Sequence, residues 1–257
     1  MITICYRGRL GNNLIQYAAA YVLAKKTALK LDAPGTIRYG NTHTYKTSSS
    51  ENNVIKTDLK SVFNIKPLVG DSFDSFIKLT DKNYFTHLET PVPNKAYQLD
   101  GFFQHKKLLV DCRREILNLY KLPESDFTPS KDSAFIACRL GDCLASSRLY
   151  CSLDGIECQL KTKRDLYDKV YITSDTINHP PLIELIKQYS LTVYQDEPIK
   201  TMLFAAKFNN LILSAGSFSY WMAYFSEATN IMVYRTRQCP LQRQKAWNYN
   251  KNVKFTT

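Results

Sequence analysis

The residues best suited to chemistry follow a short apolar run near the middle of the chain. Residues 133–138 are typical of a buried strand, and Arg139, Gly141 and Asp142 come directly after it. A guanidinium at the carboxyl end of a central strand can meet an anion in the crevice of an open α/β sheet, and its planar fork suits phosphate. Gly141 permits a sharp turn, and Asp142 can orient Arg139 or a substrate hydroxyl. An ion pair at the end of a strand explains this stretch equally well.

A second strand end lies near the amino terminus. The pattern predicts a strand over residues 2–6, a turn over 7–13 and a helix over 14–26. Such a turn offers backbone N–H groups and a helix N-terminus to an anion. Its glycine spacing is neither that of a dinucleotide fingerprint nor that of a P-loop, so a plain connection between strand and helix stays open.

Two later strands also end in polar residues, namely Ser174-Asp175 and Ser217-Phe218-Ser219. Because parallel strands bring their carboxyl ends to one edge, we expect all four strand ends to converge. Arginine, hydroxyls and turn amides suit a diphosphate. The pattern shows no group of carboxylates suited to a hard metal ion, so charge neutralisation would fall to Arg139.

The element pattern favours an α/β protein with parallel sheets. Strands over 169–175, 191–194, 211–214 and 232–235 alternate with helices over 180–189 and 199–208. We expect 232–235 to be the last strand, 143–165 to be a loop and 33–60 to be a surface excursion. In the first half the pattern predicts a strand over 97–104 and a helix over 105–119. Proline and polar residues predict a linker over 123–130 between domains 1–122 and 131–257.

Composition narrows the partners and the compartment. The net charge is +11, which favours an anionic partner, but no basic run exceeds two residues, which argues against nucleic acid. Seven cysteines without metal-like spacing, together with no recognisable signal peptide, predict reduced thiols in the cytoplasm. No apolar run reaches the roughly 18 residues of a membrane span. The positive charge also suits peripheral contact with an anionic membrane. The four scattered His predict no metal site.

Five segments, in order along the chain, resemble motifs of the GDP-fucose-dependent α-1,2-fucosyltransferases, glycosyltransferase family 11. Residues 8–18 resemble GxLGNxxxQYA, and 99–104 resemble LxGY[FW]Q. Residues 137–142 resemble HxRRxD, and 171–175 resemble a strand ending in SDD. Residues 211–221 resemble IIxNS[ST]FSWW. The chain departs from these motifs at Ala137, Leu140, Thr176 and Ala215-Gly216.

The resemblance implies an inverting glycosyltransferase of the GT-B type, with two Rossmann-like domains facing a cleft and with neither metal nor cofactor. The first domain would hold the glycan acceptor and the second the nucleotide sugar, most simply GDP-fucose. The implied site residues fall into three groups. They are Arg139 and Asp142 for catalysis; Gly8, Gly11, Asn12, Arg139, Ser174, Asp175, Glu197, Ser217, Phe218 and Ser219 for the donor; and Asp100 and Gln104 for the acceptor.

Three alternatives stay open. The chain could use another nucleotide sugar, with rhamnose, xylose or galactose as the transferred group. It could be a degenerate member that binds glycan or nucleotide without turnover, which Ala137 and Leu140 favour and Arg139 opposes. The charge alone suggests a nucleic-acid-binding protein, which salt-dependent binding would reveal. By resemblance, Glu197 or Asp196 would contact guanine, although a solvated pair at a helix start is the simpler interpretation.

Overall fold

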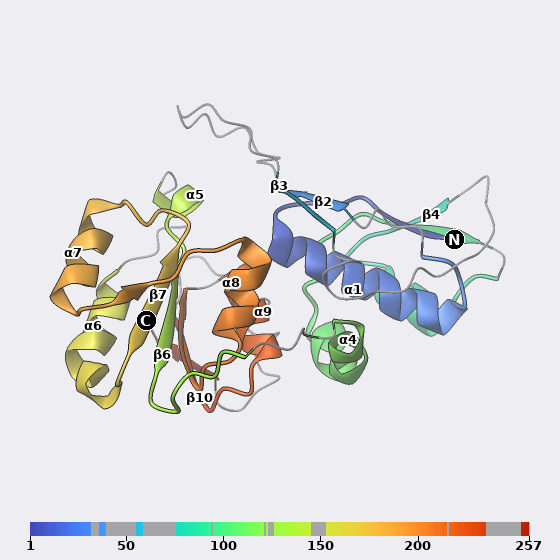
Figure 1. The fold of residues 1–257 in the computed structure, drawn as a ribbon. Helices are drawn as coiled ribbons and strands as arrows, with labels where there is room; N and C mark the ends of the chain where they lie inside the picture. Colours follow the sequence, from blue (N-terminus) through green and yellow to red (C-terminus); the bar gives the residue numbers. More distant parts are fainter. Residues whose placement is uncertain are drawn as a thin grey trace. The chain divides into compact units, whose positions relative to one another are not determined.

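The structure is a computed structural model that describes residues 1–31, 36–39, 55–58, 76–93, 95–120, 122, 126–144, 153–214, 216–234 and 253–256. At 36–39, 55–58, 142–143 and 253–256 it describes the backbone alone. The chain forms two compact units, Met1–Pro123 and Glu124–Thr257 (Figure 1). In the described ranges, no helix combines the length and apolar character needed to cross a bilayer.

A three-stranded parallel sheet organises the first unit. Its strands are β1 (Ile2–Ile4), β5 (Ala96–Leu99) and β4 (Phe76–Leu79), in that order. Helix α1 (Leu10–Thr27) follows β1 and is buried along most of its length. Because α1 begins at Leu10, Gly11 and Asn12 lie in its first turn, and the prediction that the helix starts at residue 14 was wrong.

The remaining elements of the first unit are short. They are β2 (Thr36–Tyr39), β3 (Ile55–Asp58), α3 (Tyr84–Glu89), η1 (Lys107–Asp111) and α4 (Arg113–Leu119). Strands β2 and β3 pair antiparallel, so the predicted surface excursion contains regular structure. The helix predicted over 105–119 is interrupted at Cys112, where a π-helical turn ends and α4 begins. The rest of 33–60 lies outside the described residues.

A six-stranded, fully parallel sheet organises the second unit, in the order β11-β10-β9-β6-β7-β8. The strands are β6 (Ala134–Cys138), β7 (Val170–Ser174), β8 (Thr192–Val193), β9 (Asn210–Ser214), β10 (Asn230–Tyr234) and β11 (Val253–Thr256). The prediction that 232–235 is the last strand was wrong, because β11 pairs with β10 beyond it.

The chain order makes this sheet doubly wound. It runs from β6 outward through β7 to β8, returns to the other side of β6 at β9, and continues through β10 to β11. The direction reverses between β6 and β9. In open α/β sheets this reversal opens a crevice at the carboxyl ends of the two strands, where ligands bind. The predicted α/β class with parallel sheets is therefore confirmed.

Helices cover both faces of this sheet. Helices α6 (Asp154–Lys163) and α7 (Pro180–Gln188) lie on one face, and α8 (Pro198–Ala205) and α9 (Ser217–Phe225) lie on the other (Figure 1). The loop predicted over 143–165 was wrong, because α6 occupies much of it. Ile156 and Leu160, four residues apart, are fully buried against the sheet, and this spacing places them on one side of a helix.

The segment that precedes β6 packs against the second unit through Phe127. The Phe127 ring stacks on Phe204 of α8 with ring centroids 4.5 Å apart. The Lys207 ammonium donates to the Phe127 carbonyl at 3.0 Å. Much of the segment predicted as a linker therefore packs as part of this unit.

Candidate functional site

Arg139 lies between β6 and β9, where the strand order of the doubly wound sheet changes direction. It follows β6 directly, and its backbone N–H donates to the hydroxyl of Ser214, the last residue of β9, at 2.9 Å. Ser214 is fully buried, so this bond fixes the Arg139 backbone to the neighbouring strand. The prediction that Arg139 ends a buried central strand is confirmed, because every residue of β6 is buried.

The Arg139 side chain reaches the start of α9. Its Nη1 atom lies 3.2 Å from the position that a Cβ of residue 216 would occupy. Glycine at this position lets the guanidinium approach the backbone just before Ser217. Helix α9 begins there, and the first-turn N–H groups of a helix have no partner within it. Among the described residues, the N–H groups of Ser217, Phe218 and Ser219 receive no hydrogen-bond partner.

These groups together form a compact positive site. The amino end of a helix carries a partial positive charge, and the guanidinium adds a full one. Ser217 and Phe218 are partly buried and Ser219 is buried, so the site is partly shielded from water. Its chemistry is that of an anion site with several donors, which suits a phosphate or diphosphate.

Asp175, a predicted donor residue, accepts hydrogen bonds from the turn that follows Arg139. Its Oδ1 accepts the N–H groups of Leu140 at 2.7 Å and Gly141 at 2.9 Å. A Cβ on Gly141 would lie 2.7 Å from its Oδ2. Asp175 therefore holds the turn after β6, and the N–H groups of Leu140 and Gly141 already have a partner.

The other predicted donor residues of this unit follow β7 and β8. Ser174 is buried, and its hydroxyl accepts the N–H of Thr176 at 3.1 Å. Its carbonyl accepts the side-chain amide of Gln195 at 2.9 Å. Glu197 immediately precedes α8 and is exposed, 3.9 Å from the Lys200 ammonium. Asp196 lies 3.7 Å from the same ammonium.

Two residues at which the chain departs from the motif that it resembles are buried. Leu140 belongs to the core formed with α6 and α7, and Ala137 is buried within β6. Asp142 lies in α5 (Gly141–Leu144), and its side chain is outside the described part of the structure.

The predicted residues of the first unit gather at the carboxyl end of its own sheet. Gly8 has a φ of +75°, a conformation that favours glycine. Next to it, the Asn12 side-chain oxygen accepts the Gln104 amide at 2.7 Å. Gln16 donates to the Gly101 carbonyl at 2.8 Å and accepts the Arg7 N–H at 3.1 Å. These bonds join the start of α1 to the segment after β5.

Asp100, the second predicted acceptor residue, lies between two cations. Its carboxylate pairs with the Arg7 guanidinium and, at 2.6 Å, with the Lys78 ammonium. Hydrogen bonds from Arg7 and then Lys78 hold the pKa of the Asp100 carboxyl below its usual value. The group therefore stays ionised and orients exposed cations from β4 and from the segment after β1.

Asp81 was missed by the sequence analysis. Its carboxylate accepts the N–H groups of Phe102 at 3.0 Å and Phe103 at 2.6 Å. Phe103 has a φ of +52° and is buried, so this clamp stabilises a conformation that a phenylalanine rarely adopts. Gln104 follows directly and reaches Asn12. The local pattern gave no signal, because Asp81 lies 21 residues before Phe102.

The predicted convergence of four strand ends was wrong in one respect. The ends of β6, β7 and β9 belong to one sheet, but the turn after β1 belongs to a different sheet in the other unit. Sequence periodicity does not reveal which strands share a sheet. Arg139, Ser174 and Ser217 therefore lie at one edge, whereas Gly8, Gly11 and Asn12 lie at the edge that also carries Asp100 and Gln104.

Within the described side chains, no three His, Cys, Asp or Glu residues are grouped so that they could hold a metal ion. The cysteines that the structure describes at 5, 112, 138 and 158 form no disulfide bond. Comparison of the chain with models of protein families and with curated protein sequences finds no match.

Proposed function

We propose that this protein is an inverting, metal-independent glycosyltransferase of the GT-B type, which moves L-fucose from GDP-fucose onto a glycan hydroxyl. The observation that carries the proposal is the Arg139 guanidinium beside the unpartnered first-turn amides of α9. Both lie between β6 and β9, where the direction in which the chain adds strands reverses. In this proposal the second unit binds the donor and the first unit binds the acceptor.

The chemistry of transfer fits these groups. As the bond between the sugar and the nucleoside diphosphate breaks, negative charge grows on the departing diphosphate. A charge-assisted contact from Arg139 and the fixed amides of α9 would stabilise this charge without reorganisation. The sugar becomes oxocarbenium-like, and an acceptor hydroxyl attacks its opposite face while a base takes the proton. The Ser217 hydroxyl, at the first position of α9, would add a further donor.

Recognition of the nucleotide base would fall to residues before α8. A carboxylate can accept two N–H groups from a guanine edge, and Glu197 and Asp196 precede α8 near the carboxyl edge of the sheet. Their proximity to Lys200 gives both an alternative role at the start of α8. If Glu197→Gln and Asp196→Asn leave GDP affinity unchanged, guanine recognition by these residues is excluded.

A thermal-unfolding experiment tests the proposal. We expect GDP to raise the midpoint of unfolding more than UDP or dTDP at equal concentration, because a ligand that binds only the folded state stabilises it. A donor screen that measures release of nucleoside diphosphate then identifies the transferred sugar. UDP or dTDP giving the largest shift would move the proposal to another nucleotide sugar. No shift with any of the three would remove it.

One observation favours a second candidate, a nucleotide-binding protein without turnover. The position of the second motif arginine is Leu140, which is 1 % exposed and packed in the core. Only one guanidinium is then available from this motif. GDP binding together with no product from any donor and acceptor pair would establish this candidate.

A further inference from the structure

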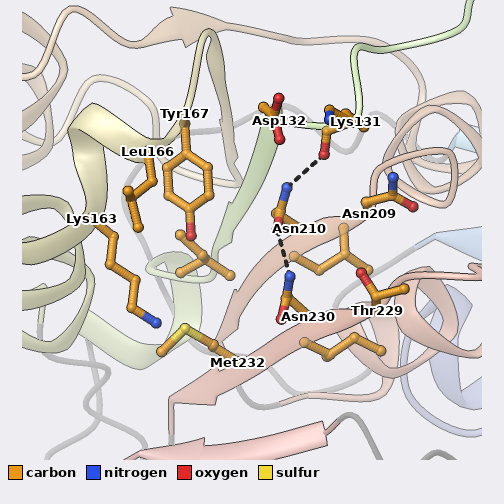
Figure 2. A pocket seen from close by; sticks show the side chains of 13 residues that line it. Lys131, Asp132, Lys163, Leu166, Tyr167, Asn209, Asn210, Thr229, Asn230 and Met232 are labelled. Carbon is orange, nitrogen blue, oxygen red and sulfur yellow. Dashed lines mark hydrogen bonds between the residues drawn. The ribbon is translucent and has the colours of Figure 1, made fainter.

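A cavity of about 480 Å³ lies at the edge of the six-stranded sheet opposite to Arg139. It opens at the amino ends of β6, β9 and β10 and is bordered by the end of α6 and the turn that follows it (Figure 2). This volume falls within the range typical of small-molecule sites. Neither the proposed donor site nor the acceptor site uses these residues.

Asn210 builds the frame of the cavity. Its side-chain amide donates to the carbonyls of Lys131 and Ser133, each at 3.1 Å, and its oxygen accepts the amide of Asn230 at 3.0 Å. Three strand ends are thereby held together. Beneath them, the buried side chains of Ile212 and Met232 supply an apolar floor.

Several polar side chains around this frame make no hydrogen bond or ion pair in the described part of the chain. Among the described residues, neither the Lys163 ammonium nor the Tyr167 hydroxyl makes a hydrogen bond or ion pair, and both point into the cavity (Figure 2). The contrast with Lys161 is informative, because that residue of the same helix pairs with Glu157 at 2.8 Å. The side chains of Lys131, Asp132 and Thr229 at the rim also have no partner in the described part of the chain.

The charge and hydrogen-bonding capacity of the lining indicate the ligand class. The lining contains two lysines, Lys131 and Lys163, and one acidic residue, Asp132, so it carries an excess positive charge. Tyr167 adds a hydroxyl donor, and burial raises the pKa of this phenol, which keeps it protonated. Asn230 and Thr229 can both donate and accept, which matches the hydroxyls of a polyol.

We propose that this cavity binds a small anionic molecule that also carries hydroxyl groups, of the class of a sugar phosphate. The anionic group lies between Lys163 and Tyr167, and the hydroxyls face Asn230 and Thr229. The site is separate from the Arg139 crevice and does not depend on the proposed transfer reaction.

Calorimetric titration with glucose 6-phosphate, glucose and inorganic phosphate at constant ionic strength tests this proposal. We expect glucose 6-phosphate to bind most tightly. Lys163→Met should weaken its binding about tenfold or more, and Tyr167→Phe about threefold to tenfold, as expected for a charged and a neutral hydrogen bond. Lys187→Met, at an exposed lysine of α7 away from the cavity, should leave the affinity unchanged.

Arg139→Ala separates the two anion sites, because it should leave glucose 6-phosphate affinity unchanged. Circular dichroism confirms that each variant is folded, and Tyr167→Phe provides a conservative second test should Lys163→Met prove unstable. Absence of glucose 6-phosphate binding overturns the proposal. So does unchanged affinity in both cavity variants, loss of affinity in Arg139→Ala, or equal affinity for inorganic phosphate or for glucose.

Discussion

At the scale of single residues, Arg139 is defined by three neighbours. The Ser214 hydroxyl fixes its backbone, Asp175 holds the turn that follows it, and Gly216 leaves space for its guanidinium. Fixed backbone and partial burial reduce the reorganisation needed to bind an anion. The residue is therefore preorganised in the way that electrostatic catalysis requires.

In the proposed function, Arg139→Ala should abolish the rise in unfolding temperature that GDP causes. It should also lower the rate of sugar transfer about 10²–10³-fold, the usual cost of losing one such donor. Arg139→Lys keeps the charge but loses the planar fork, so it should remain badly impaired. Circular dichroism should show native structure in both variants. Arg114→Ala, at an exposed arginine of α4, is the matched control. Comparable losses in the control, or full activity in Arg139→Ala, would remove Arg139 from the site.

Gly8 is a predicted site residue of the first unit, and its environment restricts which side chain the position can hold. A Cβ at this position would lie 2.3 Å from the Asn12 side-chain nitrogen, and the φ of +75° adds strain of its own. Gly8→Ala should therefore cost about 2–3 kcal/mol of unfolding free energy, of which about 1–2 kcal/mol is backbone strain. Asn12→Ala removes the 2.3 Å contact with the amide nitrogen and keeps only the Asn12 Cβ, 3.3 Å away, so in that background the cost should fall towards the strain alone.

Urea unfolding followed by circular dichroism measures both costs. Tryptophan fluorescence serves as an internal reference, because Trp221 and Trp247 both lie in the second unit. Equal costs of Gly8→Ala in the two backgrounds would show that Asn12 does not restrict this position.

At the scale of elements, the packing of α6 on β10 depends on a glycine. A Cβ on Gly155 would lie 2.3 Å from the Tyr234 ring. Alanine in a helix interior usually stabilises by about 1 kcal/mol relative to glycine, and Gly155, as the second residue of α6, gains at most that, whereas overpacking a core costs about 1–3 kcal/mol. Because the ring is buried and cannot swing aside freely, we expect overpacking to win.

Gly155→Ala should therefore lower the unfolding free energy of the second unit by about 1–2 kcal/mol, measured by tryptophan fluorescence in urea. Tyr234→Leu should reduce this penalty by removing the ring. Thr162→Ala, on the exposed side of α6, serves as the control and should change stability little. An increase in unfolding free energy in Gly155→Ala would mean that the Tyr234 ring moves aside without an energetic cost.

The helices and strands differ in how well the local sequence pattern predicted them. Strand β6 is a continuous apolar run, β7 and β9 are mostly apolar and end in serine, and α7 begins at Pro180, so the local pattern was sufficient. Helix α6 was missed because only Ile156 and Leu160 face inward within a polar stretch. The Asp81 clamp and the separation of the β1 turn from Arg139 depend on pairings between distant residues, which no local period encodes.

At the scale of the whole molecule, the positive charge is unevenly divided. Residues 1–123 carry 18 Lys and Arg against 10 Asp and Glu, a net charge of +8, whereas residues 124–257 carry 16 against 13, a net charge of +3. The unit proposed to bind the anionic nucleotide is thus the less positive one. In the proposed function, nucleotide binding would therefore depend on the local site at Arg139, and the excess positive charge of the first unit needs another explanation.

An anionic membrane surface on the acceptor side would explain it. Vesicles containing phosphatidylserine should bind the protein at low salt and release it as salt rises, because screening weakens attraction between charges. Each Lys near such a surface contributes about 1 kcal/mol, so replacing exposed Lys82 and Lys95 of the first unit by Gln should weaken sedimentation with vesicles strongly. The same change at exposed Lys169 and Lys187 of the second unit should have little effect. Equal losses from the two pairs, or binding that ignores salt and lipid charge, would show that the charge of the first unit does not direct the protein to a membrane.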